Sequence, residues 1–301
     1  MRTKLVVLFF FFTLLFLFYP GDSYYFHIFA YNREVFHDPL APKEINIQPI
    51  PRLKYPTSPD ITAQGAYIVD IPTFTPIFER SGHDRFFPAS TTKIVTALVV
   101  NDIYNSDDIL TVKKATYEGQ IMNLVLGEKI TAENLLYGIL VHSANDAAFT
   151  FAENKGYDTF IRLMNEKAKQ IHMTGSSFEN PAGLDNPNQY TTPFDLALAA
   201  RELLKNKYLA KFVSTKEIVI SDVDYVYFHK LTNVNKLLGE IHGIGGLKTG
   251  YTEIAGENLV SFYKKNGHQF IIVILKSEDR FNDTKNIVRW IDDNVTYFTV
   301  E

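Results

Sequence analysis

The order in which strand-like and helix-like apolar patterns follow one another along the chain restricts the fold to one class. Strand-like segments lie near both ends of the folded part, at residues 66–70 and 76–79 and again at 257–264 and 268–276. The residues between about 90 and 205 carry apolar side chains at helical spacing instead. Strands at both ends with helices between them predict an α+β fold, in which one antiparallel sheet unites N- and C-terminal strands and is covered by helices.

Apolar periodicity and capping residues predict five helices in the middle of the chain and one near its C-terminus. Thr131 is a candidate N-cap residue, and Thr192-Pro193 combines a cap with a proline at the first helical position. The expected helices begin near Ser90, Thr131, Asn145, Tyr157 and Thr192, the last one contains Ile287, Val288 and Ile291, and two more strands are expected at 218–220 and 225–228.

The N-terminus has the pattern of an export signal. Two basic residues precede the apolar run 5–19, as in the charged and apolar regions of a signal peptide. No A-x-A cleavage site follows, so an uncleaved anchor is favoured over a cleaved signal. We therefore expect a signal or membrane anchor at 1–25, an extended proline-rich spacer at 26–63 and a catalytic domain at 64–301.

This organisation predicts a location outside the cytoplasm. An anchored chain would lie on the extracytoplasmic face of the cytoplasmic membrane, attached through its N-terminal segment. If the leader is cleaved, the protein would be secreted or periplasmic.

Composition excludes several classes of function. The 301 residues carry a net charge of −4, so no overall positive field would recruit nucleic acid. There is no cysteine, which excludes a disulfide framework, a thiolate nucleophile and a cysteine-bound metal. An H-E-x-x-H motif is also absent, and we expect neither a metal nor an organic cofactor.

The first motif with chemical content is Ser90-Thr-Thr-Lys93. A serine hydroxyl needs a base to become a good nucleophile, and residues three apart on a helix share a face. Lys93 could be that base if burial or a nearby positive charge keeps its amine neutral. At the start of a helix, the backbone N–H of Ser90 could also serve as an oxyanion donor.

An S-x-x-K pattern alone is weak, because a solvated cap followed by a surface lysine is the commoner meaning. The chain has a second copy, Ser261-Phe-Tyr-Lys264, in a predicted strand. Positions three apart on a strand face opposite sides, so this second pair cannot work together.

The second motif is Ser143-Ala-Asn145, in a short break between two predicted helices. Its hydroxyl could relay a proton to a leaving amine, and its amide could hold a peptide group of a substrate. Taken singly, an ordinary helix N-cap is the better interpretation.

The third motif is Lys248-Thr-Gly250, after a glycine-rich segment. Lys248 offers a positive charge and Thr249 a hydroxyl for a substrate carboxylate, and Gly250 would let a substrate lie close to an edge strand. A phosphate-binding loop is excluded, because Leu247 separates the glycines from the lysine.

S-x-x-K, S-x-N and K-T-G in this order form the signature of penicillin-binding proteins and class A β-lactamases. The chain resembles the D-alanyl-D-alanine carboxypeptidase family, the low-molecular-weight penicillin-binding proteins, from about residue 66 to 293. The resemblance extends beyond the three motifs and is carried by residues 88–98, 143–148, 178–185, 232–238 and 246–252.

The resemblance implies the penicillin-recognising serine hydrolase fold and an enzyme of peptidoglycan metabolism. Its ligands would be a stem peptide ending in D-Ala-D-Ala and, as covalent inhibitors, β-lactams. It implies that Ser90 is the acylated nucleophile and that Lys93 is its base. The cleft would be lined by Ser143 and Asn145, and the substrate would be faced by Lys248, Thr249 and Gly250. The oxyanion hole would be the backbone N–H groups of Ser90 and Tyr251, and Arg280 would bind the terminal carboxylate.

Other functions stay open at this point. A D,D-endopeptidase that cuts cross-links would carry the same motifs, and so would a tethered wall-binding protein without turnover. A class A β-lactamase is disfavoured because no E-x-x-L-N segment is present. A Ser-His-Asp hydrolase is disfavoured because no G-x-S-x-G elbow is present.

Overall fold

The computed structural model describes residues 2–18, 48–115 and 118–298. The chain divides into two units, Met1–Ile47 and Gln48–Glu301. In the first, α1 (Arg2–Phe18) is a helix whose described apolar side chains are exposed. Within the described residues, no helix combines the length and the apolar character needed to span a bilayer.

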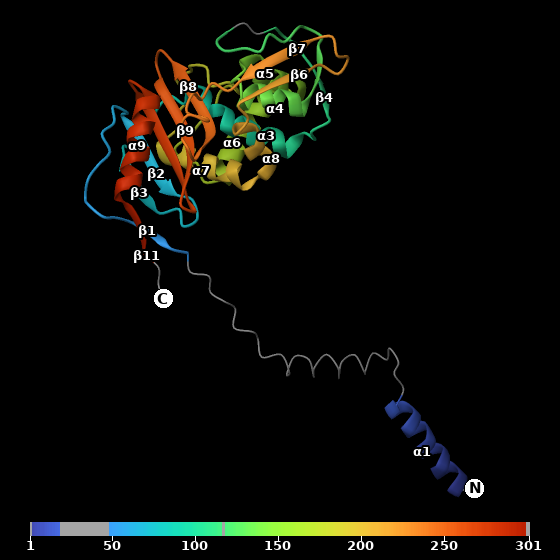
Figure 1. Ribbon diagram of the computed structural model, residues 1–301. Coiled ribbons are helices and arrows are strands. Elements are labelled where there is room, and N and C mark those ends of the chain that lie inside the picture. The colour runs from blue at the N-terminus through green and yellow to red at the C-terminus, as the bar shows by residue number, and fades with distance from the viewer. Residues whose placement is uncertain (1, 19–47, 116–117, 299–301) are drawn as a thin grey trace. The chain divides into compact units, whose positions relative to one another are not determined.

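The second unit is built on a five-stranded antiparallel sheet, which confirms the predicted α+β fold (Figure 1). N-terminal strands pair with C-terminal ones, because β2 lies beside β10. In spatial order the strands are β3 (Pro76–Arg80), β2 (Gly65–Asp70), β10 (His268–Ser277), β9 (Gly256–Lys265) and β8 (Ile244–Thr252). The last of these, β8, is an edge strand.

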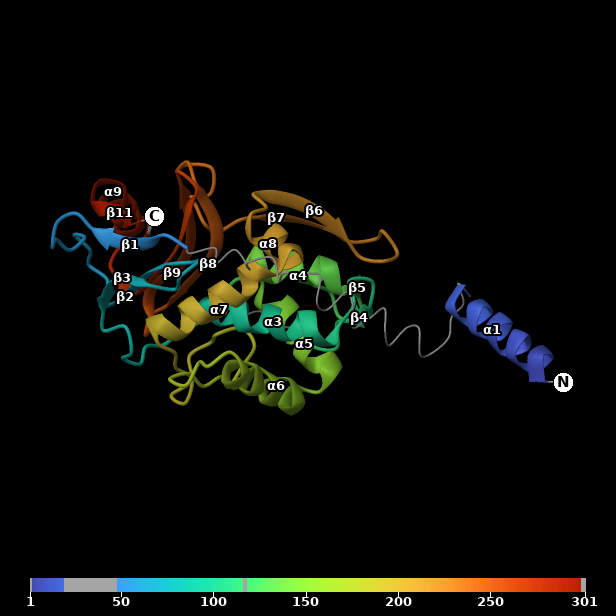
Figure 2. The ribbon, with the colours of Figure 1, turned by 90° about the horizontal axis from the view of Figure 1, so that it is seen from below.

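Strand β10 is apolar from Phe270 to Leu275 because both of its faces are covered there. Ile271 and Val273 point into the larger core, on the side of α7 (Pro193–Lys205), while Ile272 and Ile274 point into a smaller core under α9 (Arg280–Asn294). Successive strand residues face opposite sides, so a continuous apolar run serves both layers. Figure 2 shows α9 on one side of the sheet and the other helices of this unit on the opposite side.

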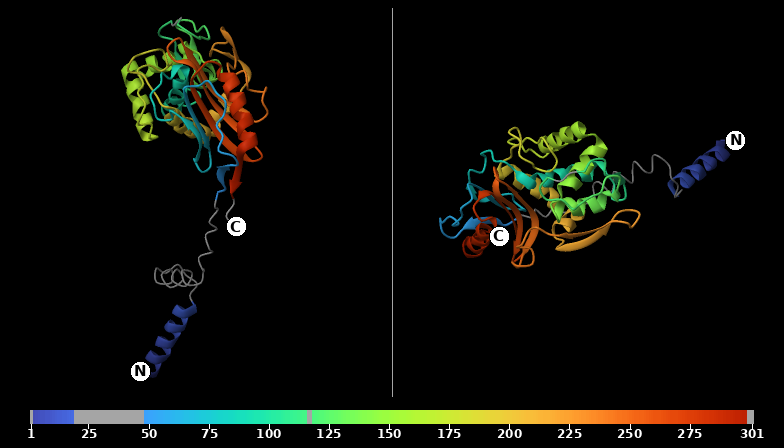
Figure 3. Two further views of the ribbon diagram at one scale, coloured as in Figure 1. Left: turned by 90° about the vertical axis from the view of Figure 1, so that its left-hand side faces the viewer. Right: turned by 90° about the horizontal axis from the view of Figure 1, so that it is seen from above.

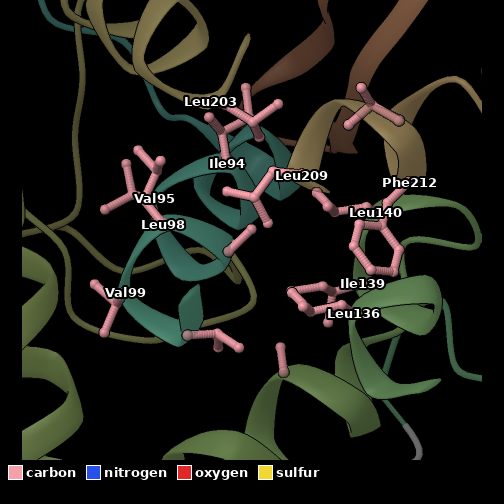
Figure 4. Packing of buried hydrophobic residues seen from close by; sticks show 14 of the residues in the cluster. Ile94, Val95, Leu98, Val99, Leu136, Ile139, Leu140, Leu203, Leu209 and Phe212 are labelled. Carbon is pink, nitrogen blue, oxygen red and sulfur yellow. The ribbon is translucent and has the colours of Figure 1, made fainter. Parts of the chain in front are cut away.

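The larger core lies among helices that begin close to the predicted positions. Their apolar stripes meet around α3, where Ile94, Leu98, Leu136, Ile139 and Phe212 pack together (Figure 4). The Thr131 and Thr192 side chains cap α4 and α7 as expected. The helices are α3 (Lys93–Ile103), α4 (Ala132–Leu140), α5 (Asn145–Lys155), α6 (Tyr157–Gln170), α7 and the short α8 (Lys207–Val213), which sequence analysis did not predict.

Three pairs of short strands complete the unit: β1 (Ile50–Leu53) with β11 (Val295–Phe298), β4 (Ile109–Thr111) with β5 (Lys129–Thr131), and β6 (Glu217–Ser221) with β7 (Phe228–Thr232). The β6–β7 hairpin projects beside the helices (Figure 3). The sequence predicts the second strand of this hairpin at residues 225–228, but in the structure this strand, β7, begins later. The Asp222 carboxylate accepts the backbone N–H groups of Val226 and Tyr227, which holds these residues in the turn.

The compact unit begins earlier than the predicted spacer allows. Residues 26–47 of that spacer lie outside the described residues, but β1 pairs with β11, and Asp283 of α9 accepts hydrogen bonds from Thr62 and Ala63. The boundary between spacer and domain was predicted too late in the chain because the proline-rich sequence was interpreted as an extended spacer. A proline such as Pro51 is tolerated in a strand at a sheet edge.

Candidate active site

The three motifs meet in one cavity of about 780 Å³. It lies where edge strand β8 passes the short helix η1 (Ala89–Thr92) and the start of α5. Seven of the nine predicted site residues line it, and the other two, Lys93 and Lys248, are fully buried beside it. The seven are Ser90, Ser143, Asn145, Thr249, Gly250, Tyr251 and Arg280.

Ser90 and Lys93 are within hydrogen-bonding distance. The lysine Nζ lies 2.9 Å from the Ser90 hydroxyl, 2.6 Å from Asn145 Oδ1 and 2.7 Å from the Ala182 carbonyl oxygen. The last two atoms can only accept hydrogen bonds. A neutral amine would give its two hydrogens to these oxygens and present its lone pair to the serine hydroxyl.

The surroundings of Lys93 favour that neutral form. Its pKa is lowered well below the ordinary lysine value, mainly by burial and also by the nearby Lys248, while the Asp146 carboxylate acts in the opposite direction. Burial penalises the charged state because a desolvated ammonium loses its hydration. The arrangement can therefore supply a base next to a hydroxyl nucleophile near neutral pH.

Asn180 was not singled out in the sequence, yet it organises the turn that holds Lys93. Its Oδ1 accepts the backbone N–H groups of Ala182, Gly183 and Leu184, and its own N–H is held by Gln189 Oε1. This turn directs the Ala182 carbonyl at the lysine amine. The Asn-Pro-Ala-Gly sequence signals a turn, but nothing local shows which buried atom the turn supports.

Gly183 makes the closest backbone approach in the site. It has φ +87°, and a Cβ atom there would lie 1.8 Å from the Ala89 carbonyl oxygen. Gly267 has φ +85° with open space around a Cβ. An alanine would therefore be strained by the positive φ at both positions, but only at Gly183 would its Cβ also clash with a backbone atom.

We expect Gly183→Ala to lower the free energy of unfolding by about 1–3 kcal/mol more than Gly267→Ala does, as overpacking of a tight site usually costs. Acylation of the protein should slow only in Gly183→Ala, because the turn carrying Ala182 would shift. Urea denaturation and β-lactam labelling of both variants check this. Equal losses in the two variants would contradict it.

Ser143 also lines the cavity and has a strained backbone conformation. Its φ of +62° is in the left-handed region, uncommon for a residue with a side chain. Lys248 Nζ donates to the Ser143 hydroxyl at 2.8 Å and to the Thr249 carbonyl oxygen at 2.9 Å. Burial, helped by the nearby Arg280, lowers the pKa of Lys248 to about 7, so this group can exchange protons near neutral pH.

Arg280 and Gly250 are linked to each other. The guanidinium donates from Nη1 to the Gly250 carbonyl oxygen at 2.7 Å, while its Nε is buried without a hydrogen-bond partner among the described residues. A Cβ at Gly250 would lie 3.0 Å from the Ser90 backbone nitrogen. Glycine thus lets β8 pack tightly against η1, since a side chain here would require η1 to move by a few tenths of an ångström, a reason additional to the expected close approach of a substrate.

A family model described as D-alanyl-D-alanine carboxypeptidase matches residues 53–279. The carboxypeptidase DacF of Bacillus subtilis is 31% identical over 76% of this chain, and DacC of Escherichia coli is 28% identical over 77%. The chain spans only 61% and 62% of the lengths of these two relatives.

Solved structures agree with this match. The Streptomyces K15 DD-transpeptidase is 30% identical, with a TM-score of 0.73, covering 78% of this chain and 98% of that one. The D-alanyl-D-alanine carboxypeptidase DacD of Francisella tularensis is 28% identical, with a TM-score of 0.72, covering 78% and 71%. These likenesses confirm the expected fold.

Proposed function

The chain belongs to the D-alanyl-D-alanine carboxypeptidase family, and on this premise we propose that it removes the terminal D-alanine from peptidoglycan stem peptides through an acyl-enzyme on Ser90. The observation that carries the proposal is the set of contacts around Lys93. Its buried amine contacts two oxygen atoms that can only accept hydrogen bonds, Asn145 Oδ1 and the Ala182 carbonyl oxygen, and on a third side it contacts the Ser90 hydroxyl.

The reaction would proceed in two steps. Lys93 takes the hydroxyl proton while Ser90 Oγ attacks the carbonyl carbon between the two D-alanines, and this proton, passed on through Ser143, leaves with the amine of free D-alanine. Water then attacks the ester, and Lys93 takes a proton from the water and gives it to Ser90 Oγ as the shortened peptide leaves. The link from Lys248 to Ser143 supports this relay, because it connects the hydroxyl to a second buried amine.

Substrate binding would use the remaining polar groups of the cavity. We propose that the backbone N–H groups of Ser90 and Tyr251 hold the oxyanion, and that Asn145 binds a peptide group. The terminal carboxylate would lie against Lys248, Thr249 and Arg280. Two neighbouring cationic side chains at one end of the cavity support that orientation.

Covalent inhibition by β-lactams would follow from the same geometry. Ser90 would open the lactam ring just as it attacks the peptide bond. Location outside the cytoplasm fits a substrate in the cell wall, and we propose that residues 1–25 serve as the signal or membrane attachment, followed by a spacer that ends before the compact unit begins at Gln48.

The experiment that tests the activity supplies two substrates to the full chain. We expect release of free D-alanine from a pentapeptide that ends in D-Ala-D-Ala. Cleavage of a cross-linked dimer without D-alanine release would instead identify an endopeptidase, and covalent β-lactam binding without turnover of either peptide would identify a wall-binding protein.

A further inference from the structure

One wall of the cavity is a strap formed by residues 118–128, which runs towards β5. Its first residues line the cavity. They also hold Asn145, whose backbone N–H donates to the Gln120 carbonyl oxygen at 2.7 Å and whose Nδ2 donates to the Glu118 carbonyl oxygen at 2.8 Å. The position of the Asn145 side chain, and so of its contact with Lys93, therefore depends on this strap.

The middle of the strap is attached to the residue after Asn145. The Asp146 carboxylate accepts the Met122 N–H at 3.1 Å and the Leu124 N–H at 3.0 Å. Asp146 is itself buried at the start of α5. The strap and the first turn of α5 are thus one connected unit.

The far end of the strap is attached to the β6–β7 hairpin through His229, which the proposed chemistry does not use. The imidazole of His229 lies between two oxygen atoms, with Nδ1 2.9 Å from the Met122 carbonyl oxygen and Nε2 2.8 Å from Glu128 Oε1. The other Glu128 oxygen accepts the Val125 N–H at 2.8 Å. His229 and Glu128 are 7% and 4% exposed, so water does not replace these contacts.

Both ring nitrogens of His229 face acceptors. A neutral imidazole has one N–H and one lone pair, so one nitrogen would direct its lone pair at an oxygen. We propose that His229 is a positioning residue that, in its doubly protonated form, clasps the strap through Met122 and Glu128 and thereby holds Asn145 in the active site. This inference rests on the proposed function of the cavity.

The charges around His229 support the protonated form. Burial alone disfavours the imidazolium, but hydrogen bonding and attraction to Glu128, with a contribution from Asp146, raise the pKa of His229 above its ordinary value. These two carboxylates face the ring from the strap and from α5, and the cross-strand neighbour of His229 is the uncharged Ile220. A group with a raised native pKa stabilises the fold at low pH, and this contribution is lost as the pH rises through the native pKa.

The clasp should therefore loosen on the alkaline side. Deprotonation of His229 would lower the activity, because the strap would no longer hold Asn145 firmly. Lys248, with a pKa of about 7, also loses its proton near neutral pH, so the contribution of His229, a residue that does not touch the substrate, is the part of the alkaline loss that a His229 variant lacks.

Nitrogen NMR of the ¹⁵N-histidine-labelled full chain tests the proposal without any substrate. We expect both His229 nitrogens to be protonated at pH 6 and to titrate above the ordinary histidine pKa of about 6.5. The amides of Met122, Leu124 and Val125 should lose hydrogen-exchange protection in the same pH range, after correction for base-catalysed exchange. A neutral ring protonated only at Nδ1 at pH 6 would overturn the proposal, whether or not the protein is an enzyme.

Activity of variants then tests the positioning role. We expect His229→Gln to slow acylation about tenfold at neutral pH and to remove the part of the alkaline loss of activity that His229 causes, with Glu128→Gln acting in the same direction. His242→Gln, at an exposed histidine, is the matched control and should match the wild type. A folded His229→Gln protein with an unchanged rate and pH profile would exclude the role, while an unreactive wild type with the expected NMR titration would instead count against the proposed function alone.

Discussion

Replacing Ser90 by alanine is expected to abolish covalent labelling of the protein by a fluorescent penicillin. The acyl-enzyme needs an oxygen nucleophile, and among the hydroxyl residues that line the cavity Ser90 is the one within hydrogen-bonding distance of the buried Lys93 amine. Labelling should fall below detection rather than be merely slowed, because the proposed mechanism gives the Ser143 hydroxyl, which contacts Lys248, a relay role and not the attack. Gel fluorescence after incubation with excess reagent, followed by intact mass, measures this effect.

Ser261→Ala is the matched control for that substitution. Ser261 belongs to the second S-x-x-K copy, is fully buried in β9, and its hydroxyl has no hydrogen-bond partner among the described residues. Labelling of this variant should equal that of the wild type. Persistent labelling of Ser90→Ala, or its loss in Ser261→Ala, would place the nucleophile elsewhere.

Replacing Lys93 by methionine is expected to slow acylation by about 10²- to 10⁴-fold, the range that a positioned general base contributes. Methionine keeps an unbranched apolar chain in a fully buried site but removes the amine that faces Ser90. The second-order rate constant for β-lactam labelling measures the loss, and a cooperative thermal transition shows that the variant is folded.

Lys264→Met supplies the corresponding control. Lys264 is the exposed lysine of the second S-x-x-K copy, in β9, and its replacement should leave the rate unchanged. A folded Lys93→Met protein that reacts within a few-fold of the wild-type rate would show that some other group takes the serine proton.

Sequence patterns were sufficient to predict the main helices and four of the five strands of the central sheet, while β8 was not among the predicted strands. The apolar run of β10 and the caps at Thr131 and Thr192 are local signals, and the structure agrees with them. The proposed catalytic residues at the cavity could also be predicted from the sequence, because the three ordered motifs contain them. Residues 143–145 and 248–250 lie far apart in the chain, yet they meet beside Ser90.

Features that depend on distant backbone atoms could not be predicted in the same way. The Ala182 carbonyl reaches Lys93 only because Asn180 folds the turn and Gly183 packs against Ala89. No periodicity reveals such a contact. Strand β1 was likewise missed, since its proline-containing sequence becomes a strand only by pairing with β11.

The pH dependence of the acylation rate tests most directly whether Lys93 acts as a neutral base. Measured as the second-order rate constant for β-lactam labelling from mildly acidic to alkaline pH, the rate should rise as the Lys93 ammonium loses its proton. The apparent pKa of this ascending limb should lie well below the free-lysine value of about 10.4. A rate that stays flat across this range would contradict the role of Lys93 as the base.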